Sequence, residues 1–215
     1  MTADASLTAE SMVRWLSEAS RLLHEARDEL TELDAARGDA DHGVNMDRGF
    51  QAVVTALSEE SFDSPQAVLL RASTVLRRSM GGTSGPLWSA ALRAMSRALG
   101  DGARVDCRRI APALLDAAQA ISALGGAKEG DNTMLDVLFP ASRELARELD
   151  DGAPLDAALE RTGVVAAELA RATADHGSTR GRASYLGDRA IGSADPGATS
   201  AALVVIALRA ALTAT

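Results

Sequence analysis

Eight segments of the chain repeat apolar residues at three- and four-residue steps, which is the spacing of one face of an α-helix. The first pattern runs from about Ala9 to Ala36, and the second begins near Asn45. The remaining patterns begin near Ser64, Leu87, Asp106, Asp131, Pro154 and Thr199, and the last ends near Leu212. No segment has a convincing strand pattern. We therefore predict an all-α fold, an antiparallel up-and-down bundle or barrel of eight helices.

Local signals support several of these helix boundaries. Thr8 is a suitable N-cap for the first helix, and Ser64 followed by Pro65 is typical of a helix start. Asp106 is expected to cap the fifth helix, and Gly125-Gly126 is expected to end it. Pro140 lies inside the sixth pattern and is expected to kink that helix.

Composition agrees with a helical protein. The chain has 215 residues, of which 47% are hydrophobic and only 3% are aromatic, and much of the apolar content is alanine. Such a composition favours closely packed helices over a β-sandwich. Because the sequence contains no internal repeat and no low-complexity linker, we predict a single domain over residues 1–215.

Charge and cysteine content exclude several protein classes. A net charge of −8 argues against a nucleic-acid binder, which needs a basic face, and against a polybasic membrane anchor. Cys107 is the single cysteine, so no internal disulfide can form. The N-terminus lacks the pattern of a signal peptide, and the longest apolar run, Ala201 to Leu208, is too short to span a bilayer. We expect a cytoplasmic protein with no nucleic-acid or membrane partner.

Three carboxylates crowd the connection between the first two helices. Asp34, Asp39 and Asp41 fall within eight positions, and such groups repel one another unless a cation neutralises them. Oxygen ligands suit Mg²⁺ or Ca²⁺, but the spacing does not fit an EF-hand, because Val44 and Phe50 fall where that loop needs Gly and Glu. The alternatives left open are a Mg²⁺ site completed by phosphate oxygens and a solvated helix end.

The connections between helices alternate in character. The first, third, fifth and seventh are rich in glycine, whereas the others are ordinary polar turns such as Glu59-Glu60-Ser61. In an up-and-down bundle, alternate connections lie at the same end. We therefore expect all four glycine-rich loops at one end, beside the carboxylates.

Each glycine-rich loop leads into a helix N-terminus, where free backbone N–H groups attract anions, phosphate above all. The best candidate cradles are Gly82-Thr83-Ser84-Gly85 and the segment from Asp195 to Ser200. The last loop is longer than a bundle needs and contains Arg182, which could bind a phosphate or simply be solvated. The chain contains neither a P-loop nor a nucleophile-elbow motif.

Four blocks in order resemble the nucleotide-binding L subunit of bacterial dihydroxyacetone kinase. They are Gly38-Asp39-Ala40-Asp41-His42-Gly43 with Asn45-Met46; Gly81-Gly82-Thr83-Ser84-Gly85-Pro86-Leu87; Gly130-Asp131-Asn132-Thr133-Met134-Leu135-Asp136; and Gly181-Arg182-Ala183-Ser184-Tyr185-Leu186-Gly187 with Asp195-Pro196-Gly197-Ala198-Thr199-Ser200. Ala40 stands where glycine is frequent in this family, which should affect the flexibility of the loop and not its ligands.

The resemblance implies an eight-helix antiparallel barrel with ADP or ATP at one end and two Mg²⁺ ions. The implied metal ligands are Asp34, Asp39 and Asp41. Arg182 is implied as a charged clamp that takes part in catalysis. The implied nucleotide contacts are His42, Gly43, Val44, Asn45, Thr83, Ser84, Gly125, Met134, Arg182, Asp195, Pro196 and Gly197. For Met134, a plain core role is the alternative.

The family resemblance also implies partners. In the family, a separate K subunit holds dihydroxyacetone on a histidine, and in stand-alone L subunits a phosphohistidine protein of the phosphotransferase system rephosphorylates the bound ADP. The chain is expected to follow the stand-alone form. Two alternatives stay open: a subunit of the same fold that serves another acceptor, such as a tetrose sugar or a fatty acid, and a nucleotide-bound regulator of a transcription factor.

Overall fold

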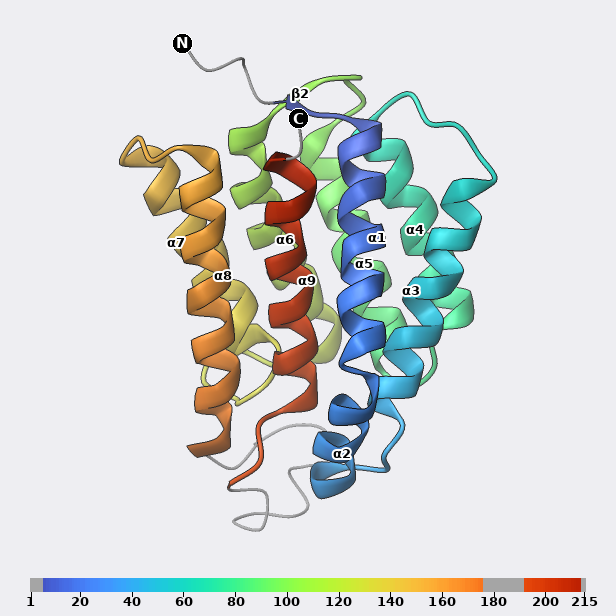
Figure 1. Cartoon of the computed structure of the whole chain (residues 1–215), viewed down its shortest axis with the longest axis vertical. Helices are drawn as coiled ribbons and strands as arrows, with labels where there is room; N and C mark the ends of the chain where they lie inside the picture. The colour runs from blue at the N-terminus through green and yellow to red at the C-terminus, as the bar shows by residue number, and fades with distance from the viewer. Residues whose placement is uncertain (1–5, 176–191, 214–215) are drawn as a thin grey trace.

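A computed structural model of the protein describes residues 6–175 and 192–213, and most of these residues are helical (Figure 1). The α-helices are α1 (Ala9–Glu25), α2 (Arg27–Arg37), α3 (His42–Ser58), α4 (Pro65–Ser79), α5 (Ser84–Leu99), α6 (Ile110–Gly125), α7 (Leu135–Asp150), α8 (Leu155–Ala172) and α9 (Pro196–Thr213). Two-residue strands β1 (Ser6–Leu7) and β2 (Val105–Asp106) and the 3₁₀ helices η1 (Cys107–Arg109) and η2 (Thr173–Asp175) complete the described elements.

The long helices form a closed ring. Each packs against the helix before and after it in the chain, and the ring closes where α1 packs against α9 on one side and α3 on the other (Figure 1). The short helix α2 extends α1 and packs mainly against α3. The prediction of an eight-helix antiparallel barrel is therefore confirmed, with α1 and α2 together in place of the first helix.

The barrel interior consists mainly of alanine, leucine and valine, with few large rings. Trp15 on α1 donates its indole N–H to the carbonyl of Val204 on α9 over 2.9 Å, which satisfies a buried donor where the ring closes. The rings of Phe50 on α3 and Trp88 on α5 meet edge to face at 6.1 Å and 82°. Small side chains elsewhere let the helices approach closely.

The predicted first helix is wrong in one respect, because it is two helices. At Ala26 the backbone turns to φ −89° and ψ 4°, and α2 leaves the axis of α1. In the first turn of α2, the Thr31 hydroxyl donates to the Arg27 carbonyl over 2.8 Å, a bond that bends helices. The bend brings α2 onto α3, where the hydrogens of Gly43 face the Arg27 carbonyl. Hydrophobic periodicity continues through the break and cannot show it.

Most predicted boundaries are confirmed, and two predictions need correction. Thr8 and Ser11 form a capping box at α1, Ser64 caps α4, and Gly126 ends α6 in the left-handed conformation with φ 68°. Asp106, however, accepts a bond from the N–H of Arg108 and so caps η1, which precedes α6. The sequence also predicted no strand, whereas β1 and β2 pair antiparallel in register Ser6–Asp106 and Leu7–Val105.

Helix α9 is long and apolar enough, by length and composition, to cross a membrane, with a mean hydropathy of 1.5 over 18 residues. In the structure it is one of the helices that form the barrel, it packs against α1 and α8, and 56% of it is buried inside the protein. Its apolar composition follows from this position.

Helix α7 runs through Pro140 without interruption.

Candidate active site

Four loops meet at the end of the barrel opposite the start of α1 and the end of α9 (Figure 1). They are the connections before α3, α5 and α7 and the described residues 173–175 and 192–195 of the connection before α9, as the alternation of glycine-rich loops predicted. Side-chain bonds link them: the His42 ring contacts Ser84 and Ser200, and the Asn132 amide reaches the end of α8. The loops therefore form one continuous site, and the prediction that they gather at one end is confirmed.

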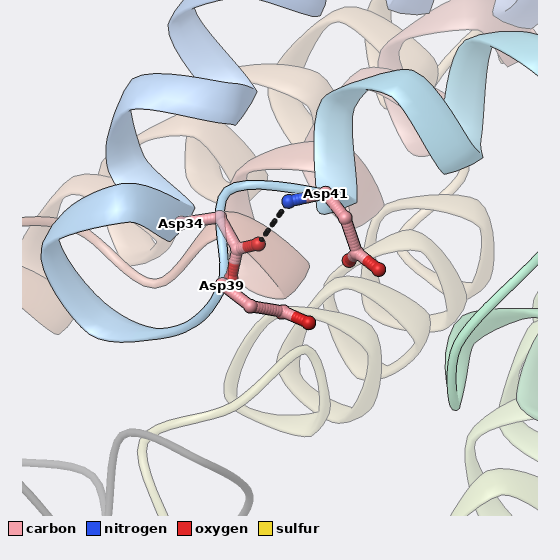
Figure 2. Close-up of side chains that lie close together, drawn as sticks. All are labelled: Asp34, Asp39 and Asp41. Atoms are coloured by element: carbon pink, nitrogen blue, oxygen red, sulfur yellow. Dashed lines mark hydrogen bonds between the residues drawn. The ribbon is translucent and has the colours of Figure 1, made fainter.

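Asp34, Asp39 and Asp41 converge in the first of these loops. Each offers a carboxylate oxygen, and the three oxygens lie within 4.8 Å of one another. Asp34, at the end of α2, is only 9% exposed, whereas Asp39 and Asp41 extend from the loop into solvent (Figure 2). An oxygen-only cluster of this size fits a hard divalent cation such as Mg²⁺.

The Asp34 carboxylate also organises the loop. Its Oδ2 accepts the backbone N–H groups of Asp41 at 2.8 Å and His42 at 3.1 Å, so it satisfies free donors at the start of α3 (Figure 2). Gly38 lets the backbone pass close to it, because a Cβ there would press against the Asp34 Oδ1 unless the carboxylate moved. Ala40 holds the left-handed backbone conformation with φ 61°, which an alanine rarely adopts. The loop thus returns onto Asp34 at some cost in backbone strain.

His42, the first residue of α3, links three helices. Its Nε2 lies 2.9 Å from the Ser200 hydroxyl on α9, and its Nδ1 lies 3.4 Å from the Ser84 hydroxyl on α5. The Ser200 hydroxyl donates to the Gly197 carbonyl over 3.0 Å, so we assign the ring proton to Nε2, which donates to Ser200. Burial lowers the pKa of the imidazole, although the carboxylates of Asp34 and Asp41 oppose the shift.

The next residues of α3 face the α4–α5 loop. Val44 is 49% exposed, whereas Asn45 is buried and its Oδ1 accepts from Arg48 over 2.7 Å. A Cβ on Gly81 would lie 2.6 Å from that same oxygen, so glycine lets the loop pass close to Asn45. Thr83 is exposed and directly precedes α5. The predicted contacts on α3 and α5 therefore share one wall of the site.

A second wall of the site comes from α6, α7 and α9. Met134 is 8% exposed and immediately precedes α7, and a Cβ on Gly197 would lie 3.8 Å from its Cβ. Gly125 is the last residue of α6 and faces Leu87 on α5. These residues lie at the same end of the barrel as the carboxylates.

Asp195 caps α9 beside this wall. Its Oδ1 accepts the N–H of Ala198 over 2.7 Å, and Pro196 and Gly197 form the first turn of the helix. Loss of hydration raises the pKa of Asp195 to about 6, against the lowering effects of the Ala198 N–H and of Arg37. The Asp195 carboxylate is therefore desolvated in the position where it caps the first turn of α9.

Several residues at the site were not singled out from the sequence. The Asp136 carboxylate accepts the N–H groups of Gly130 at 2.6 Å and Thr133 at 2.7 Å and so shapes the α6–α7 loop. Arg37 is 2% exposed and donates to the carbonyl of Thr173 over 3.0 Å. Asp136 lies in a block that carried the family resemblance, but Arg37 and Thr173 are 136 positions apart and have no sequence signal.

Arg182, predicted as a catalytic clamp, lies outside the described residues and stays a prediction. The chain enters and leaves that stretch at neighbouring points, because the Gly192 N–H donates to the Ala174 carbonyl over 2.8 Å.

Comparison with known proteins identifies the family. Residues 36–210, which are most of the chain, match the DAK2 domain. The chain belongs to the DAK2 domain family. The ADP-binding subunit DhaL of the PEP-dependent dihydroxyacetone kinase of Escherichia coli is 34% identical over 195 residues, covering 91% of this chain and 93% of that subunit. The resemblance to L subunits drawn from the sequence is therefore confirmed.

Other relatives contain the DAK2 domain within a longer chain. The D-erythrulose kinase of Mycolicibacterium smegmatis is 40% identical over 204 residues, and the alignment covers 93% of this chain but 35% of that enzyme. The dihydroxyacetone kinase of C. freundii in complex with AMP-PNP and Mg²⁺ superposes with a TM-score of 0.72 at 26% identity, over 94% of this chain and 33% of that one. Its native form gives a TM-score of 0.74 at 24% identity. This DAK2 domain therefore spans about a third of those kinases.

Proposed function

We propose that this DAK2 domain binds ADP or ATP with Mg²⁺ and transfers a phosphoryl group from the nucleotide to dihydroxyacetone held on a separate K subunit. The observation that carries the proposal is the cluster of Asp34, Asp39 and Asp41 directly before the N-terminus of α3, at the end where four helix N-termini gather. Support comes from the DhaL relatives, which are named ADP-binding subunits, and from the related kinase crystallised with AMP-PNP and Mg²⁺.

The donor set fits magnesium. All three candidate ligands are carboxylates, and two of them are exposed and able to accept a cation without burying charge. We propose two Mg²⁺ ions, the number that the resemblance to L subunits implies, with water and phosphate oxygens completing their coordination. When bound, magnesium would offset the negative charge of the phosphate chain. The Asp34 carboxylate accepts the backbone N–H groups of Asp41 and His42 and so fixes the conformation of the loop. The loop backbone that carries Asp39 and Asp41 is therefore already in place before a cation binds.

The other predicted residues have roles that follow from their positions. Backbone N–H groups at Thr83–Ser84 and at Gly197 lie at helix N-termini, where they would bind phosphate oxygens. Met134 would pack against the base, and Gly125 would leave room beside it. Arg182 would add a charged clamp. The chain needs no general base, because the acceptor hydroxyl belongs to the partner's site.

The phosphoryl donor in this proposal is a phosphohistidine protein of the phosphotransferase system. The relatives that align over nearly their whole length are named PEP-dependent in Escherichia coli and PTS-dependent in Lactococcus lactis. A protein with a net charge of −8 is a poor partner for nucleic acid or an anionic membrane, so we expect a cytoplasmic subunit that binds other proteins.

A second acceptor has a specific observation in its favour. The D-erythrulose kinase of Mycolicibacterium smegmatis is more similar, at 40% identity, than the DhaL subunits. A four-carbon keto sugar on the partner would use the same nucleotide site. A nucleotide-bound regulator, in contrast, would bind ADP tightly and transfer no phosphate.

The test is phosphoryl transfer by the purified chain with a K subunit and the phosphohistidine donor, with dihydroxyacetone and D-erythrulose offered in parallel. Asp39→Ala should abolish formation of the sugar phosphate and leave the helical circular dichroism unchanged. Asp63→Ala is the matched control, because Asp63 is an exposed aspartate in the α3–α4 turn at the other end of the barrel. Unchanged turnover by Asp39→Ala would remove the metal assignment.

A further inference from the structure

Thr173, the first residue of η2, is bonded to the end of α2 and to the loops before α7 and α9. Its main-chain carbonyl accepts from Arg37 Nη2 at 3.0 Å and from Asn132 Nδ2 at 2.8 Å. Its hydroxyl oxygen accepts the backbone N–H of Asp195 at 2.8 Å, and the hydroxyl proton is donated to the Ala170 carbonyl. The residue is 3% exposed, so these bonds are shielded from water. One buried residue therefore contacts the loops before α7 and α9 and the end of α2, which leads directly into the loop before α3.

Each of the three partners lies next to a predicted ligand-binding group. Arg37 is the last residue of α2 and lies between Asp34 and Asp39 in the sequence. Asn132 lies two positions before Met134 and holds the left-handed conformation with φ 62°, which directs its amide to Thr173. Asp195 directly precedes Pro196 and Gly197 in the first turn of α9. The metal loop and the α9 cradle therefore share a common anchor.

Buried hydrogen bonds of this kind restrict motion, because breaking one leaves a polar group without water or a partner. A shift of the Asp195 N–H would cost its bond to Thr173 and would also move the cap on Ala198. If Arg37 moved away from Thr173, water could not take the place of the Thr173 carbonyl as its acceptor, because Arg37 is only 2% exposed. The positions of the two loops are therefore interdependent.

We propose that Thr173 is a positioning residue that holds the metal loop and the phosphate-binding turn of α9 in register for Mg²⁺ and the nucleotide. This inference rests on the proposed function, because it assumes that the site binds Mg²⁺–ADP. Thr173 acts through Arg37, Asn132 and Asp195 and contacts neither group itself.

The experiment compares Thr173→Val with Thr162→Val. Both threonines are buried on or next to α8, and both donate a hydroxyl proton to a carbonyl of that helix, but only Thr173 accepts a bond from a site loop. Isothermal titration with ADP in the presence of Mg²⁺ should show about tenfold weaker binding for Thr173→Val and unchanged binding for Thr162→Val. Thr173→Ser keeps the hydroxyl and should restore the wild-type affinity.

A second variant keeps the test valid if Thr173→Val does not fold. Asn132→Gly retains the left-handed backbone and removes the side chain that donates to the Thr173 carbonyl, and it should weaken ADP binding severalfold while leaving the circular dichroism unchanged. In the kinase assay, both variants should raise the KM for the nucleotide more than they lower kcat.

The outcomes separate this inference from the function on which it rests. If the wild-type chain does not bind ADP with Mg²⁺, the proposed function fails. Thr173→Val loses the bond to the Asp195 N–H but keeps the main-chain carbonyl that accepts from Arg37 and Asn132. If the wild type binds and Thr173→Val is weakened no more than Thr162→Val, the function stands and the role of the Thr173 hydroxyl is overturned. If Asn132→Gly also binds as tightly as the wild type, the role of the Thr173 carbonyl is overturned as well.

Discussion

The imidazole Nε2 of His42 lies 2.9 Å from the Ser200 hydroxyl oxygen and joins the first turn of α3 to the second turn of α9 across 158 positions of sequence. His42 follows Asp41 directly, so this bond connects the carboxylate loop to the helix whose first turn would hold phosphate. The ring is buried and has hydroxyl partners at both nitrogens. The geometry places a proton on Nε2, and burial of the ring favours the neutral imidazole.

We predict that the pKa of His42 in the folded protein lies below its ordinary value of 6.5, because burial disfavours the charged ring. An unfolded chain then binds a proton at a higher pH than the folded one. The contribution of neutral His42 to the free energy of unfolding is therefore fully present above about pH 6.5, and it decreases as the pH falls from there toward the pKa of the folded state. Nuclear magnetic resonance of the labelled imidazole should show the Nε2–H form at pH 7.

Urea unfolding at a series of pH values tests the same point energetically. The His42→Gln variant should lose less stability than the wild type between pH 7 and pH 5.5, since its side chain does not titrate. A titration midpoint for His42 at or above 6.5, or identical pH dependence in the two proteins, would contradict the prediction.

Ala40→Gly should stabilise the protein by about 0.5–1 kcal/mol, because Ala40 holds a left-handed φ of 61° that costs about 1 kcal/mol for a residue with a Cβ. The matched control is Ala35→Gly in α2, where glycine should destabilise by about 0.5–1 kcal/mol. The free energy of unfolding in urea measures both. Equal losses in the two variants would show that the loop is not strained at Ala40.

Ser73→Ala should leave stability unchanged or raise it by about 1 kcal/mol. The Ser73 side chain on α4 is fully buried, and its hydroxyl has no hydrogen-bond partner within residues 6–175 and 192–213. Removing it deletes an unsatisfied polar group. Ser96→Ala on the adjacent α5 is the control, because the Ser96 hydroxyl donates to the Gln66 carbonyl over 3.0 Å, and it should cost about 1 kcal/mol. A large destabilisation by Ser73→Ala would reveal a bond that the structure does not contain.

The barrel and the location of its site were predictable from the sequence because both depend on local signals. Hydrophobic periodicity marks the helices, and an up-and-down order places alternate glycine-rich loops at one end, where Asp34 and His42 lie. The break at Ala26 was not predictable, since alanine is a strong helix former and the bend accompanies the tertiary packing of α2 against α3 near Gly43. The bond from Arg37 to Thr173 was not predictable either, because it joins two loops 136 positions apart through a main-chain carbonyl that any residue possesses.

The most direct test of the central claim is isothermal titration of the purified chain with ADP, with and without Mg²⁺, for the wild type and Asp39→Asn. We predict tight binding by the wild type that depends on Mg²⁺. For Asp39→Asn we predict at least about tenfold weaker binding in Mg²⁺, because one charged ligand is lost from the three-carboxylate cluster. Binding of ADP that is equally tight without Mg²⁺, or unaffected by Asp39→Asn, would contradict the assignment of this end of the barrel as a magnesium-dependent nucleotide site.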